Sequence, residues 1–165
     1  MAALPYLNGY PPPLLASAQA LLDQGHAQAY LARRYPHAHD VRNDGALVEY
    51  VGALKARYMR TAPPLAKVAF DGRLQQLHQA LGTHTAVSRV QGRQLKGKRE
   101  IRIARVFIEA PEAFLRMIVI HELAHLRERD HDKAFYALCQ HMDADYHQLE
   151  FDTRLWLTAR EQPGA

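Results

Sequence analysis

The sequence lacks the features of an exported or membrane-bound protein. Its single cysteine, Cys139, excludes an internal disulfide and therefore a disulfide-stapled scaffold. The longest apolar run, Met117–Ile120 with its flanks, is far shorter than the roughly 18 residues that a membrane span requires. The N-terminus has no basic segment, and prolines 11–13 interrupt any signal-like apolar stretch. We therefore expect a cytoplasmic protein that does not enter a membrane.

What is present fits one soluble domain of ordinary size. The chain has 165 residues, 48% hydrophobic and 23% charged, which is enough to bury roughly 70% of its unfolded surface without a staple. The net charge of +4 is too small to identify a class of partner. Ten histidines could add to this positive charge below about pH 6.5.

Hydrophobic periodicity predicts a helical first third and a mixed remainder. Asp44 is a candidate N-cap, and Ile101 and Ile103 should face inward from a strand. The sequence Pro63-Pro64 predicts a boundary between a helical N-terminal extension (1–62) and a second domain (63–165). The expected helices cover residues 14–25, 26–35, 44–60, 73–81, 111–129, 132–142 and 146–159, with strands at 67–70, 83–90 and 100–103 around a hairpin connection at 91–98.

The motif His121-Glu122-Leu-Ala-His125 carries the strongest chemical signal. Two histidines four residues apart lie about 40° apart on a helix and can share one metal ion, whereas Glu122 lies about 100° round from His121, where a general base is needed. A catalytic zinc usually has three protein ligands, and His131 is the best third candidate if the chain turns back. The other candidates for that position are His141, Asp143, Asp145 and His147.

The segment from Ile118 to Leu138 resembles the core of the YgjP-like, or WLM, group of small zincin metallopeptidases. The resemblance covers residues 85–157 and implies that His121, His125 and His131 hold zinc and that Glu122 is the base. It also implies an α+β zincin-like domain in which a small, mostly antiparallel sheet packs on the metal-bearing helix. One departure is Ser88-Arg-Val-Gln-Gly92, where the family commonly has an Arg-Trp-Gly-Ser type of segment.

The metzincin pattern also places a third histidine six residues after the second. It requires a glycine midway, where this chain has Glu128, and a downstream Met-turn, for which Met142 is too close. This alternative is therefore disfavoured.

These residues predict a zinc-dependent hydrolase, in the first instance of peptide bonds in a peptide or protein substrate. Glu122 would take a proton from water acidified by zinc, and a second donor would stabilise the oxyanion. Tyr146, His147 and Arg89 are the candidates for that donor or for a substrate contact. A structural site would have no need of Glu122, which favours an enzyme over a non-catalytic zinc module.

Charge is distributed unevenly around the motif. Residues 88–105 hold seven bases and one acid, and residues 121–152 hold eight acids and three bases. A basic segment that docks on its own acidic half explains this pattern, but a bound nucleic acid or nucleotide at Arg89–Arg105 explains it too. Hydrolysis of a nucleotide phosphoanhydride at the same metal, and a non-catalytic zinc-containing nucleic-acid-binding module, therefore remain alternatives. The sequence does not indicate an oligomeric state.

Overall fold

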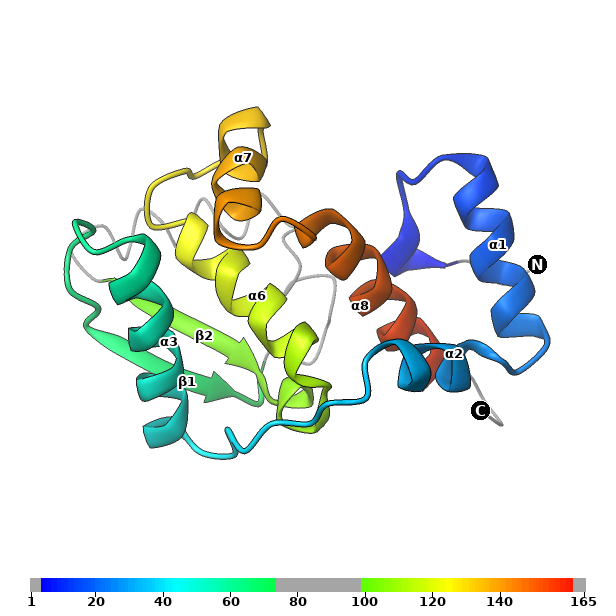
Figure 1. The fold of residues 1–165 in the computed structure, drawn as a ribbon, viewed down its shortest axis with the longest axis horizontal. Helices are drawn as coiled ribbons and strands as arrows, with labels where there is room; N and C mark the ends of the chain where they lie inside the picture. The colour runs from blue at the N-terminus through cyan, green and yellow to red at the C-terminus, as the bar shows by residue number, and fades with distance from the viewer. Residues whose placement is uncertain (1–3, 74–98, 162–165) are drawn as a thin grey trace.

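The computed structural model describes residues 4–73 and 99–161 and has an α+β architecture, as predicted (Figure 1). A two-stranded sheet and α3 lie on one side of the central helix α6, and α8 lies on its other side. In chain order the elements are η1 (Pro5–Leu7), α1 (Pro12–Asp23), α2 (Ala27–Arg34), α3 (Asp44–Tyr58), β1 (Lys67–Asp71), β2 (Glu100–Ala104), η2 (Arg105–Glu109), α6 (Glu112–Ala124), α7 (Lys133–Met142) and α8 (Tyr146–Glu161).

The two described strands run parallel, with Lys67 opposite Glu100 and Asp71 opposite Ala104. The predicted antiparallel arrangement is therefore wrong for this pair. Parallel strands need a crossover connection of about a dozen residues or more, and residues 72–99 between β1 and β2 are long enough to provide one. Ile101 and Ile103 are buried, as their alternation with polar residues predicts.

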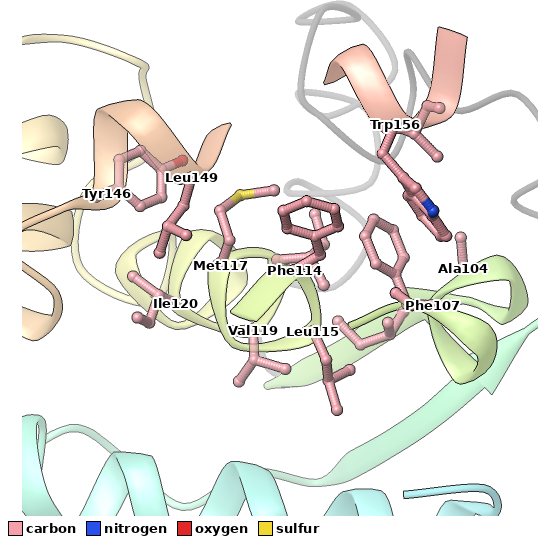
Figure 2. Close-up of a cluster of buried hydrophobic side chains, with 14 of the residues drawn as sticks. Ala104, Phe107, Phe114, Leu115, Met117, Val119, Ile120, Tyr146, Leu149 and Trp156 are labelled. Atoms are coloured by element: carbon pink, nitrogen blue, oxygen red, sulfur yellow. The ribbon is translucent and has the colours of Figure 1, made fainter. Parts of the chain in front are cut away.

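Helix α6 is apolar almost all round because it packs on two opposite sides. Phe114 and Met117 point toward α8 and the Trp156 ring, whereas Leu115 and Val119 point the other way, toward the side where α3 lies (Figure 2). These four α6 side chains are fully buried. A helix enclosed in this way holds its last turn, which carries His121, in a fixed position.

Most helix ends lie within two residues of the prediction, and two differences at helix ends affect the contacts of the site and the sheet. Asn43, not Asp44, caps α3, because the Asn43 side chain accepts a hydrogen bond from the Ala46 N–H at 2.8 Å. Asp44 begins the helix and accepts a bond from the Phe70 N–H at 2.9 Å, which ties α3 to β1. Helix α6 ends at Ala124, five residues earlier than predicted.

The N-terminal segment packs on α8. The Tyr6 hydroxyl donates to Glu161 at 2.6 Å, the Arg154 guanidinium donates to the Tyr6 carbonyl at 2.8 Å, and the Tyr35 hydroxyl donates to the buried Asp152. Leu7 and Leu31 belong to the same hydrophobic core as α6 and α8. The boundary placed between residues 62 and 63 stays a prediction.

Several sequence predictions lie outside the described residues. They are most of the helix at 73–81, the strand at 83–90, the connection at 91–98, the Ser88–Gly92 departure, and Arg89 with most of the basic segment. In the part of the chain that is described, none of the helices combines the length and the hydrophobicity needed to cross a membrane.

Candidate metal centre

Three imidazoles converge at the end of α6. The Nε2 atom of His131 lies 3.0 Å from Nε2 of His125 and 3.3 Å from Nε2 of His121. Within residues 4–73 and 99–161, these three histidines form the cluster of potential ligand atoms that could hold a metal ion. His121 is 1% exposed, and the other two rings are half-buried. The structure thus brings together the three residues that the motif and its spacing selected.

The early end of α6 brings the third histidine back. The backbone leaves the helix at His125 and turns through Leu126 and Arg127, whose N–H groups bond back to Leu123 and Ala124. Asp132 then caps α7 by accepting a hydrogen bond from the Phe135 N–H at 3.0 Å. Because the chain reverses between these two helices, His131 faces the His121–His125 pair.

The imidazole rings of His121 and His125 are oriented by hydrogen bonds at Nδ1, the ring nitrogen that does not face the cluster. The Nδ1 atom of His125 lies 2.9 Å from the Glu128 carbonyl oxygen, which can only accept, so Nδ1 carries the proton and Nε2 carries the lone pair. The Nδ1 atom of His121 lies 2.9 Å from the Tyr146 hydroxyl. Burial lowers the pKa of His125, which favours the neutral ring that a metal requires.

The geometry fits a divalent metal such as zinc. Ligands placed tetrahedrally at about 2.0–2.1 Å from a zinc ion lie about 3.3 Å from one another. The Nε2 separations of 3.0 and 3.3 Å are close to this value. Three imidazole nitrogens that converge on one point are a donor set that suits a divalent cation, so they indicate a metal site.

Phe135 lies against all three imidazoles. Its ring centroid is 5.0 Å from that of His121, 4.6 Å from that of His125 and 4.9 Å from that of His131. The Phe135 side chain is fully buried. An apolar ring in this place limits the rotation of the histidines and excludes water from one side of the cluster.

Glu122 is the acidic residue of the motif and lies on α6 beside His121. The residue is only partly exposed, and desolvation raises the pKa of its carboxyl group to about 8. A bound cation nearby would lower that pKa again. A carboxyl group that can change its protonation state near neutral pH is suited to accept and return a proton.

The remaining candidates from the sequence lie in different places. Tyr146 is fully buried behind His121, a position that favours orienting this ring over contacting a substrate. His147 is exposed and lies against the Tyr136 ring, with centroids 5.2 Å apart. Arg89 is outside the described residues.

The alternative third ligands are separated from the histidine cluster. Asp143 accepts an ion-paired hydrogen bond from Arg116 at 2.8 Å, and His141 lies against Tyr58 with ring centroids 5.8 Å apart. Asp145 lines a surface pocket of about 430 Å³ beside Arg116. These two acids and His141, like His147, are not members of the converging group.

Sequence reasoning missed the residues that support the ligands. Phe135, the Glu128 carbonyl and the positioning contact of Tyr146 all depend on how α6, α7 and α8 meet, which no local spacing encodes. One signal in the sequence could have pointed to Phe135. Asp132 is an N-cap residue that fixes where α7 begins and hence where Phe135 points. Cys139 is buried, and burial raises the pKa of its thiol to about 12, which favours the neutral thiol over the nucleophilic thiolate.

Comparisons with known proteins agree with this centre. A model of the YgjP-like metallopeptidase domain matches residues 53–154. A UTP pyrophosphatase from Escherichia coli (strain K12) is 57% identical over 158 residues, which cover 96% of this chain and 95% of that protein. No solved structure matches the chain significantly. The converging histidines, the family match and the near full-length relative together show that the chain belongs to the YgjP-like metallopeptidase family.

Proposed function

We propose that this protein is a zinc-dependent hydrolase that cleaves UTP to UMP and pyrophosphate. The observation that carries the proposal is the three-histidine centre beside Glu122, in a chain 57% identical to a UTP pyrophosphatase. His121, His125 and His131 would hold the ion through their Nε2 atoms. When bound, zinc supplies a Lewis acid and an acidified water at neutral pH.

Charge supports an anionic substrate. The two orienting partners of the ligands are neutral, since one is the Tyr146 hydroxyl and the other is the Glu128 backbone carbonyl. Each of these two Nδ1 contacts is therefore made to an uncharged group. A divalent ion held by three neutral imidazoles would bring two positive charges to a site whose nearby acids are Glu122 and Asp130, and the phosphates of a triphosphate could bind to that ion.

The proposed reaction uses one water and one protein base. Glu122 accepts a proton as the water oxygen forms a bond to the α-phosphorus of UTP. The bond between that phosphorus and the oxygen bridging to the β-phosphorus breaks, and pyrophosphate leaves. The proton held by Glu122 then returns to the leaving pyrophosphate or to solvent, so atoms and charge balance.

Peptide-bond hydrolysis is the second candidate, because the family model that matches residues 53–154 describes a metallopeptidase domain. The same base and the same ion would serve attack on a carbonyl carbon. The described residues 67–71 and 100–104 also offer strand backbone with which an extended peptide could pair. This candidate predicts cleavage of unfolded proteins and no release of pyrophosphate from UTP.

Replacing Glu122 separates catalysis from metal binding. Glu122→Gln should reduce UTP turnover by about 10²- to 10⁴-fold while the protein keeps its stoichiometric zinc, since only the base is lost. Turnover would be followed by the release of UMP and pyrophosphate, and zinc by metal analysis of the purified protein. Glu49→Gln, an exposed carboxylate on α3, is the matched control and should behave as the wild type.

Zinc-loaded wild type that does not hydrolyse UTP would overturn the proposal. Cleavage of unfolded casein that depends on Glu122, in the absence of UTP turnover, would establish the second candidate instead.

A further inference from the structure

A buried hydrogen bond lies behind the metal centre, on the Nδ1 side of the His121 ring. The Nδ1 atom of His121 lies 2.9 Å from the Tyr146 hydroxyl. His121 comes from the last turn of α6 and Tyr146 from the first turn of α8. Both side chains are buried, so water does not compete for this bond.

The direction of this hydrogen bond follows from the role of the opposite ring nitrogen. If the Nε2 lone pair of His121 is to face the other two histidines, Nδ1 must carry the ring proton and donate it to the Tyr146 oxygen. A neutral imidazole carries only one ring proton, so this arrangement selects the Nδ1–H tautomer of His121.

We propose that Tyr146 is a positioning residue that fixes His121 in the Nδ1–H tautomer and aims Nε2 at the metal. The inference rests on the metal site of the proposed function, and it is independent of the substrate. It replaces the expectation that Tyr146 contacts the substrate, because the hydroxyl lies on the side of the imidazole opposite to Nε2 and its residue is fully buried.

The Tyr146 contact also joins α8 to a metal ligand that is carried by α6. His125 is held by a carbonyl only three residues away, within the same turn, whereas His121 is held by a residue 25 positions later. The orientation of His121 therefore depends on the docking of α8 against α6. Such outer contacts typically change metal affinity by about 10- to 100-fold when they are removed.

The direct test is the zinc affinity of Tyr146→Phe, measured by competition with a chromophoric chelator on the full-length protein. We expect the affinity to fall by about 10- to 100-fold. The control is Tyr136→Phe, which removes a hydroxyl from a ring packed against Tyr146 and should leave zinc affinity within about twofold of the wild type. Equal zinc affinities of wild type and Tyr146→Phe would overturn the proposal, whether or not UTP is hydrolysed.

A second measurement needs no variant and decides the question if Tyr146→Phe does not fold. In zinc-loaded wild-type protein labelled with ¹⁵N in its histidines, long-range ¹H–¹⁵N correlation spectra report which ring nitrogen of His121 is protonated. The proposal requires a protonated Nδ1 whose hydrogen exchanges slowly with solvent. A His121 ring protonated at Nε2, or an Nδ1 proton that exchanges as fast as one on an exposed imidazole, would contradict it.

Discussion

Asp71 at the end of β1 shows how one side chain can secure the sheet. Its carboxylate accepts hydrogen bonds from the Arg73 backbone and side chain and an ion-paired bond at 3.2 Å from Arg102 on β2. Arg73 in the first place, with a further contribution from Arg102, lowers the pKa of Asp71 to about 2 against the opposing effect of desolvation. Asp71 itself is 8% exposed, although Arg73 is largely in solvent.

This lowered pKa predicts a pH-dependent contribution to stability. The stabilisation is present at pH values above the unfolded pKa of about 4 and is lost as the pH falls through about 2. Asp71→Asn should therefore reduce the free energy of unfolding by about 1 kcal/mol at pH 7, and the difference from wild type should shrink below pH 4. Urea unfolding of the two proteins between pH 2.5 and 7 checks this.

The control is Glu109→Gln, which removes an exposed ion pair with Arg160 and should change stability by no more than a few tenths of a kcal/mol at any pH. A constant difference between wild type and Asp71→Asn from pH 7 to 2.5 would contradict the assignment.

The position of the third ligand, His131, depends on where α7 begins. Asp132 follows His131 directly, and its side chain caps the helix that carries Phe135. Removing this cap leaves an N–H of the first turn without its side-chain partner, so the first turn frays. Because Phe135 lies against the imidazoles, fraying of α7 should also loosen the metal site.

Two N-caps of the same kind allow a matched comparison. Asp132→Ala and Asn43→Ala should each lower the free energy of unfolding of the metal-free protein by about 1 kcal/mol. Only Asp132→Ala should also weaken zinc binding, by about threefold or more, because α3 does not hold a ligand. Thermal unfolding and chelator competition measure the two effects. If both variants weaken zinc binding alike, the effect is a general loss of stability and the local explanation fails.

Most elements could be predicted from periodicity, and their pairing could not. The helices of residues 12–58 and 133–161 follow from apolar spacing and from breaks at Gly25 and Pro36, whereas the parallel pairing of β1 and β2 depends on a contact between distant segments. The three histidines could be predicted because two lie on one helical turn and the third lies just beyond it. The roles of Phe135 and Tyr146 could not, since they arise only when helices meet.

At the scale of the molecule, the N-terminal segment is part of the core. Leu7 in η1 is fully buried and packs in the same cluster as α8, whereas Leu14 in α1 is 44% exposed. Leu7→Ala should lower the free energy of unfolding by about 3 kcal/mol in one cooperative transition, and Leu14→Ala by less than about 1 kcal/mol. Denaturant unfolding, monitored by circular dichroism and by tryptophan fluorescence, tests both predictions.

The measurement also tests the boundary predicted between residues 62 and 63. If residues 1–62 unfold as a separate unit, the two probes will give different midpoints and the single Trp156 will not report the Leu7→Ala change.

The contact between Tyr6 and Glu161 spans 155 positions and closes nearly all of the described chain into a loop. Contacts of such separation form late, because the chain entropy of the whole loop is lost before they stabilise anything. During synthesis, η1 therefore emerges long before its partner helix exists. Since α8 also provides Tyr146, the hydrogen bond that orients His121 can form only after residue 146 has been translated. We therefore expect tight zinc binding to accompany completion of the fold rather than to initiate it.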